Sequence, residues 1–168
     1  MQVSEIMTRL VHTVRADANL EQASRRLRDK CVGFLPVVEQ VMVTGTHQKK
    51  AVLDEIGVHP VVEKEILVGV LGVRDIVVRA IALGMEPTKT PVSEIMHRDF
   101  ARCYQDDEVS KALDVMEQRK VRRLIVLDRE DEVAGVLSVS DISADDTLSS
   151  AEILKALRQR AAQACPIS

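Results

Sequence analysis

Hydrophobic and polar positions along this chain predict the same order of secondary-structure elements twice. In each half, an extended opening segment is followed by an amphipathic helix, two apolar runs and a second helix. The runs "FLPVV", "LVGVLGV", "RLIVL" and "EVAGVLSV" have strand length, and their Val and Ile content favours strands over helices. The predicted fold is therefore α/β (α+β), with the unit β-α-β-β-α present twice.

The first helix of each predicted unit has an apolar face at helical spacing. These faces consist of Leu20, Ala23, Leu27 and Cys31 in the first unit and of Val109, Ala112, Leu113 and Met116 in the second. Asn19 with Gln22 resembles a capping box at the start of the first helix, as do Ser149 and Glu152 before a C-terminal helix. Gly84 is the expected end of the helix "DIVVRAIALG".

The amino-acid sequence itself repeats in the same way. "VSEIMTR" at 3–9 returns as "VSEIMHR" at 92–98, an offset of 89 residues, whereas "GVLGVRDI" at 69–76 returns as "GVLSVSDI" at 135–142, an offset of 66. The first copy is therefore 23 residues longer than the second. We predict a first repeat at 1–84 with an insertion at about 40–63, a linker at 85–91, a second repeat at 92–148 and a C-terminal helix at 149–168.

Composition narrows the class of protein. The 168 residues are 46% hydrophobic and 29% charged, which is typical of a soluble globular protein. A net charge of −3 gives no general basis for binding nucleic acid. No apolar run is long enough to span a membrane, and no signal-peptide core is visible. The 3 Cys residues are widely spaced, which suits a reducing cytosol rather than a disulfide framework.

No catalytic motif is visible in the sequence. It contains no GxSxG, no HExxH and no phosphate-binding loop of the Walker type. We therefore expect a protein that is not an enzyme.

The two "VSEIM" openings and the two glycine-to-aspartate octapeptides together closely resemble a pair of CBS domains, also called a Bateman module. The resemblance covers nearly the whole chain, roughly residues 3–142. It implies two repeats packed with pseudo-twofold symmetry, two ligand clefts, and a homodimer. It also implies a non-catalytic regulatory module that binds an adenine nucleotide or adenosyl compound such as AMP, ADP, ATP or S-adenosylmethionine. The implied partners further include an unidentified target protein.

The resemblance also implies which residues bind the ligand. The family's signature is a glycine, then a Ser or Thr hydroxyl, then an Asp whose carboxylate can accept hydrogen bonds from ribose. For a second cleft it indicates Gly135, Ser138, Asp141, Ala101, Cys103, Arg123, Leu124 and Ile125. For a first and weaker cleft it indicates Thr13, Val14, Phe34, Leu35, Pro36, Arg74 and Asp75, with Gly72 in place of the hydroxyl residue.

Each of these residues also has a purely structural interpretation. Asp75 and Asp141 follow a strand and precede a helix, where an Asp commonly caps the helix. Arg74 and Arg123 could reach phosphates or could simply be solvated. A ligand-free module for protein interaction is the alternative function.

The insertion leaves two arrangements open. "PVVE" occurs at 36–39 and again at 60–63, so either copy could supply the strand that pairs with the octapeptide. Alternatively, the intervening residues extend the hairpin and fold back as a short helix. We favour an excursion that begins after Glu39 and projects beside the first cleft. His47 and His59 lie in the insertion without Cys or carboxylate support, so we expect no metal site.

Overall fold

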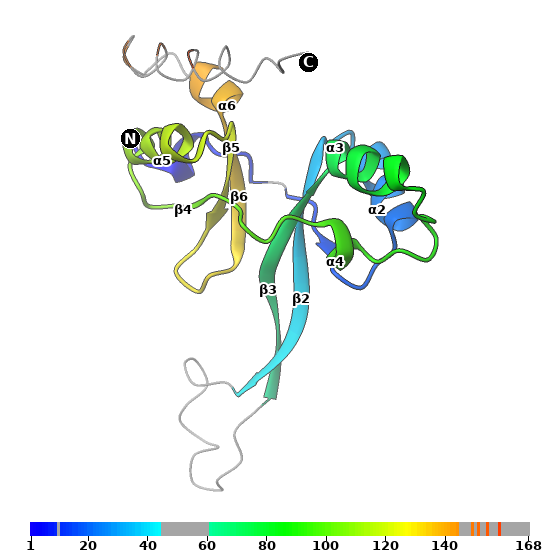
Figure 1. Cartoon of the computed structure of the whole chain (residues 1–168). Coiled ribbons are helices and arrows are strands. Elements are labelled where there is room, and N and C mark those ends of the chain that lie inside the picture. Colours follow the sequence, from blue (N-terminus) through cyan, green and yellow to red (C-terminus); the bar gives the residue numbers. More distant parts are fainter. Residues whose placement is uncertain are drawn as a thin grey trace, which may run out of the picture.

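The computed structural model describes residues 1–9, 11–44 and 61–144, together with the separate residues 149, 151, 154 and 158. Within these ranges the chain forms two three-stranded sheets, of strand order β1-β2-β3 and β4-β5-β6 (Figure 1). In each sheet the first pair of strands is parallel and the second pair is antiparallel. The predicted mixed α/β class and the two similar units are confirmed.

The elements of the first unit are α1 (Val3–Ile6), β1 (Val14–Arg15), α2 (Leu20–Asp29), β2 (Phe34–Thr44), β3 (Val61–Gly72), α3 (Val73–Asp75), η2 (Ile76–Ala80) and η3 (Ile81–Leu83). Those of the second unit are α4 (Val92–Ile95), β4 (Arg102–Tyr104), α5 (Val109–Arg119), β5 (Arg123–Leu127), β6 (Val133–Ser138) and α6 (Val139–Ala144). The extended openings that we expected begin instead with one helical turn, α1 or α4.

The predicted helix faces are largely correct. Leu20, Ala23 and Leu27 are buried on α2, and the predicted face of α5 is buried as well. Asn19 and Gln22 form the predicted capping box, and Gly84 ends its helix at a φ of 70°. The prediction that Cys31 lies on this helix face is wrong. α2 ends at Asp29, and Cys31 is exposed in the loop that follows, at a φ of 53°.

The β2–β3 hairpin is longer than its counterpart in the second unit. β2 pairs with β3 from Phe34 opposite Gly72 to Thr44 opposite Val61, so the first "PVVE" and residues 61–63 of the second lie in this one hairpin. In Figure 1 the hairpin extends beyond the turn between β5 and β6. The Lys64 ammonium group donates a hydrogen bond to the Glu130 carbonyl oxygen in that turn. The remainder of the predicted insertion, including His47 and His59, lies outside the described residues, as does most of the predicted C-terminal helix.

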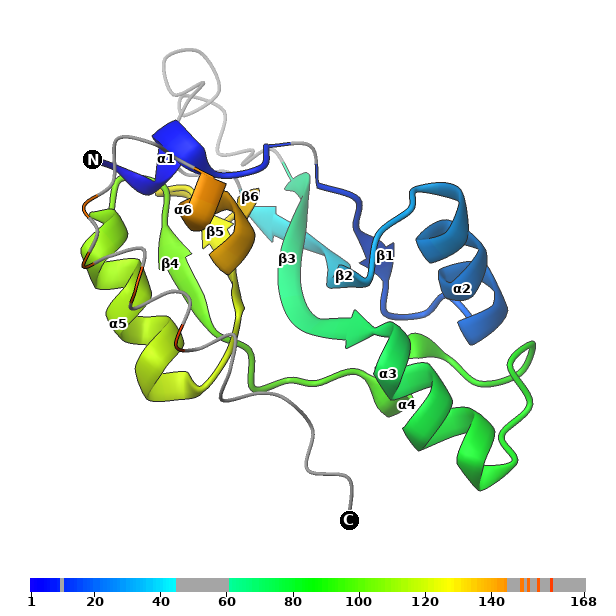
Figure 2. The ribbon, with the colours of Figure 1, turned by 90° about the horizontal axis from the view of Figure 1, so that it is seen from above.

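The two units exchange their opening segments, residues 3–9 and 92–98. Val3 and Met7 belong to the hydrophobic core of the second unit, whereas Val92 and Met96 belong to the core of the first. Figures 1 and 2 accordingly show α1 beside α5 and α6, and α4 beside α2 and α3. Each opening segment therefore packs on the core of the other unit.

Backbone hydrogen bonds repeat this exchange symmetrically. Thr8 and Val136 exchange N–H···O bonds of 2.9 and 3.0 Å, and His97 and Val70 exchange two bonds of 2.9 Å. These two pairs occupy equivalent positions in the two repeats. The exchange brings residues of one repeat beside the octapeptide of the other, and this determines which residues form each cleft.

Candidate ligand clefts between the repeats

Two clefts lie between the repeats at equivalent positions. We name the larger one, of about 760 Å³, the His97 cleft, and the smaller one, of about 250 Å³, the Asp141 cleft. The His97 cleft is lined mainly by Val70, His97, Asp99, Phe100, Ala101, Arg119, Arg122, Arg123 and Ile125. The Asp141 cleft is lined mainly by Thr8, Val11, His12, Cys31, Val32, Pro36, Arg123, Ser138 and Asp141. Phe34 lines both clefts.

The Asp141 carboxylate is held at the start of α6 by Ser138. Its Oδ2 atom accepts hydrogen bonds from the Ser138 backbone N–H, at 2.7 Å, and from the Ser138 hydroxyl, at 2.6 Å. The Thr8 hydroxyl is 3.5 Å from Oδ1. Asp141 is thus not the residue before the helix, as the capping interpretation expected, but the third residue of α6, and its side chain accepts the N–H of Ser138, which precedes the helix. This interaction uses only one carboxylate oxygen fully. Oδ1 retains the capacity to accept hydrogen bonds from a ligand.

The Asp75 carboxylate has a different second partner. Its Oδ2 atom accepts a hydrogen bond from the Gly72 backbone N–H at 2.7 Å, and its Oδ1 atom is 2.6 Å from Nε2 of His97. The other ring nitrogen of His97 is 3.5 Å from a guanidinium nitrogen of Arg79, which also donates to the Ile95 carbonyl oxygen. Both oxygens of Asp75 are thus engaged at short distance.

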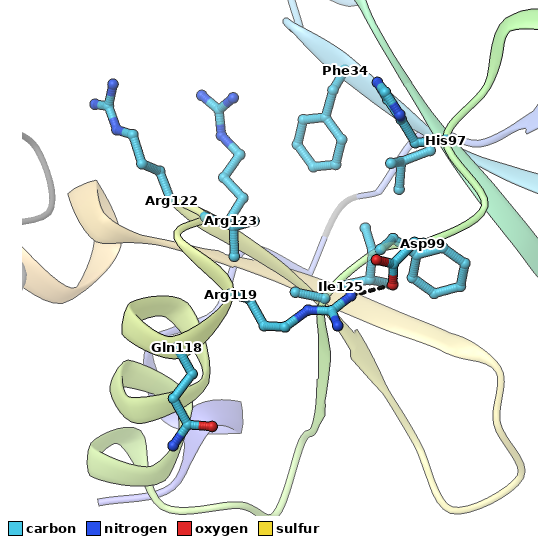
Figure 3. Close-up of a pocket in the computed structure, with 12 residues that line it drawn as sticks. Phe34, His97, Asp99, Gln118, Arg119, Arg122, Arg123 and Ile125 are labelled. Atoms are coloured by element: carbon cyan, nitrogen blue, oxygen red, sulfur yellow. Dashed lines mark hydrogen bonds and ion pairs between the residues drawn. The ribbon is translucent and has the colours of Figure 1, made fainter. Parts of the chain in front are cut away.

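Arginine side chains dominate the polar wall of the His97 cleft. In Figure 3, Arg122 and Arg123 extend from the same end of β5, while Arg119 turns toward Asp99 and forms an ion pair with it. Phe34 of the first repeat and His97, from the exchanged opening segment of the second repeat, face them (Figure 3). The cleft therefore combines apolar surface with positive charge, which suits a ligand with both an aromatic and an anionic part.

The first glycine of each octapeptide, Gly69 or Gly135, leaves room for the exchanged opening segment that packs against it. A Cβ atom on Gly135 would lie 2.7 Å from the Met7 sulfur and 2.9 Å from the Thr8 carbonyl oxygen. A Cβ atom on Gly69 would lie 2.8 Å from both the Met96 sulfur and the His97 carbonyl oxygen. Gly135 lies in neither cleft lining. Its role in the structure is to let the opposite opening segment approach.

The structure groups the sequence-predicted residues differently from our expectation. Ser138 and Asp141 share a cleft with Phe34 and Pro36 of the first repeat, not with Ala101 and Ile125. Ala101 and Ile125 instead line the His97 cleft. Our sequence grouping assumed that each cleft is built from one repeat. The exchange of opening segments makes both clefts composite.

Several predicted residues lie outside both clefts. Leu35 and Leu124 are fully buried in the two cores, while Thr13 and Val14 line a separate surface groove beside α2. Arg74 is exposed and lines neither cleft.

Cys103 is also a core residue. Its side chain packs in the core of the second unit, where burial, reinforced by the nearby Asp107 charge, raises the pKa of its thiol to about 12. Cys103 is therefore an unreactive thiol at neutral pH.

Sequence reasoning missed cleft residues at the ends of the opening segments, in the loops that follow them, and between the end of the first long helix and β2 or β5 in each unit. They are Thr8, Val11, His12, Cys31 and Val32 in one cleft and His97, Asp99, Phe100, Arg119 and Arg122 in the other. One pattern could have indicated two of them. Thr8 and His97 differ between otherwise matching heptapeptides, as Gly72 and Ser138 do between the octapeptides.

In the part of the chain that the structure describes, no three His, Cys, Asp or Glu side chains gather in a way that could hold a metal ion. None of the helices in that part has both the length and the apolar character needed to cross a membrane.

The family model for the CBS domain matches residues 3–45 and 92–145. The chain therefore belongs to the CBS-domain family, in which it forms a pair of CBS repeats. The CBS domain-containing protein YhcV of Bacillus subtilis is 27% identical over 141 residues, which cover 84% of this chain and 82% of YhcV. Other curated relatives are much longer, and the chain spans only 26% and 21% of the length of two of them.

Solved structures with this fold include two ligand complexes. The CBS domain protein PAE2072 from Pyrobaculum aerophilum, complexed with AMP, matches with a TM-score of 0.64 and 21% identity, covering 94% of this chain and 99% of that one. The CBS domain pair of MJ0100, in complex with 5′-methylthioadenosine and S-adenosyl-L-methionine, matches with a TM-score of 0.61 and 21% identity, covering 85% and 97%. At 21% identity, the likeness to these two structures shows a shared fold and nothing further.

Proposed function

We propose that this chain is a non-catalytic regulatory module that binds an adenine nucleotide or another adenosyl ligand in the clefts between its CBS repeats. The observation that supports this most directly is the Ser138–Asp141 pair, whose carboxylate faces an inter-repeat cleft with Oδ1 only weakly engaged. The complexes of PAE2072 with AMP and of MJ0100 with adenosyl compounds support the choice of ligand class.

Within this proposal the Asp141 cleft binds ribose more tightly than the His97 cleft. Asp141 can offer Oδ1 to the ribose hydroxyls, because its nearest partner, the Thr8 hydroxyl, is 3.5 Å away. Asp75 lines neither cleft in the structure, and it would first have to release His97, which lies 2.6 Å from the corresponding oxygen. Breaking a charge-assisted contact of this kind reduces the net gain from binding.

The ligand would act by bridging the two repeats. Each cleft draws residues from both repeats, so a bound ligand favours the arrangement in which both sets of contacts form. It can shift the equilibrium between arrangements only by its difference in affinity for them. A target protein or a second copy of the chain would detect the arrangement.

A titration with AMP, ADP, ATP and S-adenosylmethionine, followed by calorimetry and thermal denaturation, tests this function. Asp141→Asn is the key variant, because it removes the charge and retains one acceptor oxygen. Asp107→Asn is the matched control, since Asp107 also accepts a backbone N–H from three residues earlier, that of Tyr104 at 2.8 Å, and lines neither cleft. We expect binding that Asp141→Asn weakens and Asp107→Asn leaves unchanged. Equal effects of the two variants, or no binding to the wild type, would refute the proposal.

The predicted homodimer and the alternative of a ligand-free interaction module both need an exposed contact surface. A row of apolar side chains on the helical segment after β3 is about half exposed or more, and it consists of Val73, Val77, Val78, Ile81 and Leu83. Exposed rows of this kind mark interaction surfaces. Analytical ultracentrifugation of the wild type and of Ile81→Glu tests the dimer. A dimer without any nucleotide response would favour the alternative. The predicted cytosolic location is part of the proposal as well.

A further inference from the structure

Phe34 and Arg123 form a partition between the two clefts. Both residues line both clefts, and they occupy equivalent positions, 89 residues apart, at the start of β2 and of β5. The guanidinium carbon of Arg123 lies 5.3 Å from the centroid of the Phe34 ring, a favourable cation–π distance (Figure 3). The pseudo-twofold arrangement thus places an aromatic ring from one repeat against a cation from the other.

Positive charge is distributed unequally around this partition. Among the described residues that line the Asp141 cleft, Arg123 is the only Arg or Lys. The His97 cleft also contains Arg122, whereas its Arg119 is already paired with Asp99. On β5, Arg123 lies directly opposite Ser138 in the strand pairing, so its side chain starts beside the predicted ribose site.

We propose that Arg123 is a phosphate-binding residue shared by the two clefts, so that phosphorylated ligands in the two clefts compete for it. This rests on the adenosyl-binding function proposed above and adds a coupling between the sites. A guanidinium binds a phosphate most strongly through a bidentate contact, and the Arg123 side chain can extend into only one cleft at a time to make it. The first phosphorylated ligand therefore draws Arg123 away from Phe34, and the second binds without it. The coupling is reciprocal and does not affect an uncharged nucleoside.

The test compares AMP with adenosine by ¹H–¹⁵N NMR titration. The amides of Val32 and Ser138 report the Asp141 cleft, and those of Val70 and Val121 report the His97 cleft. The blocking variant is Val136→Trp, whose side chain enters the Asp141 cleft. With that cleft blocked, we expect the His97 cleft to bind AMP about tenfold more tightly than it does in the wild type, because Arg123 is released. Its affinity for adenosine should not change.

The matched control adds Arg123→Met to Val136→Trp, and the gain in AMP affinity should then disappear, whereas Arg122→Met should leave it in place. A gain of equal size for adenosine, or one that survives Arg123→Met, would overturn the sharing.

The wild-type protein gives an independent reading through the side-chain Nε–Hε resonance of Arg123. That resonance should shift while the first cleft fills with AMP and not while the second fills, because the second ligand binds without Arg123. In Val136→Trp it should shift while the His97 cleft fills, and no shift in that variant contradicts the proposal. If the wild type binds neither AMP nor adenosine, the proposed function fails as well.

Discussion

Replacing Gly135 by Ala tests the exchange of opening segments without involving any ligand. The new methyl group would lie 2.7 Å from the Met7 sulfur and 2.9 Å from the Thr8 carbonyl oxygen, and contacts shorter than 3.0 Å essentially do not occur for a Cβ atom. Met7 can change rotamer, but the Thr8 carbonyl oxygen accepts the Val136 N–H at 3.0 Å and cannot retreat without losing that hydrogen bond. The opening segment must therefore move.

Overpacking of this kind typically destabilises a protein by about 1–3 kcal/mol. For a chain of this length, that corresponds to a fall in Tm of roughly 2–12 °C. Urea denaturation followed by circular dichroism measures the free energy of unfolding. Gly69→Ala should behave similarly, because its methyl group would meet His97 and Met96 in the equivalent way.

Gly33→Ala is the matched control. Nothing lies within 4 Å of the position of its Cβ atom, and its backbone has no positive φ. We expect its effect on the free energy of unfolding to stay within about 0.5 kcal/mol. If Gly135→Ala proves as well tolerated as Gly33→Ala, the close approach of residues 3–9 to the second unit is wrong.

Four further outcomes can be measured on the same protein. Ser138→Gly removes the 2.6 Å hydrogen bond from the Ser138 hydroxyl to Asp141 and should destabilise the fold by about 1 kcal/mol. The reciprocal Gly72→Ser should not destabilise it. Equal losses for the two variants in urea denaturation would contradict this account. His97→Thr frees the Asp75 carboxylate and should raise the affinity of the His97 cleft for adenosine severalfold, and an unchanged affinity in the NMR titration would show that His97 does not compete with the ligand. Iodoacetamide at pH 8.5 should modify Cys31 and leave Cys103 intact in the folded protein, as read by peptide mass mapping. The pKa of the Cys103 thiol, about 12, lies above the ordinary 9.0, so the folded state keeps a proton that the unfolded state loses. The contribution of Cys103 to stability should therefore fall as the pH rises from about 9 to 12. Cys103→Ala should flatten that part of the plot of unfolding free energy against pH.

Local chemistry explains why much of the fold was predictable. The spacing of Leu20, Ala23 and Leu27 and the capping pair Asn19–Gln22 specify a helix through contacts between near neighbours, and α2 forms as expected. In both repeats the octapeptide contains the end of a strand and the start of a helix, and the conformational preferences of neighbouring residues again account for this. The wrong prediction for Cys31 has a local cause as well. Its spacing suits the helix face, but α2 ends at Asp29 and Cys31 has a positive φ.

The clefts were less predictable because they depend on an exchange between units. Nothing in "VSEIMTR" indicates whether residues 3–9 pack on their own unit or on the other one, since the apolar residues suit either core. The pairing of Asp141 with Thr8, and of Asp75 with His97, follows only from that choice. The sequence therefore indicates Ser138 and Asp141 as candidates but not the residues that face them.

The most direct test of this account is a crystal structure of the protein grown with AMP. We predict AMP in the Asp141 cleft, with its ribose on Asp141 and its base against residues of the first repeat such as Val32 and Pro36. A ligand that contacts Asp141 together with Ala101 and Ile125, or AMP bound in neither cleft at saturating concentration, would contradict the account.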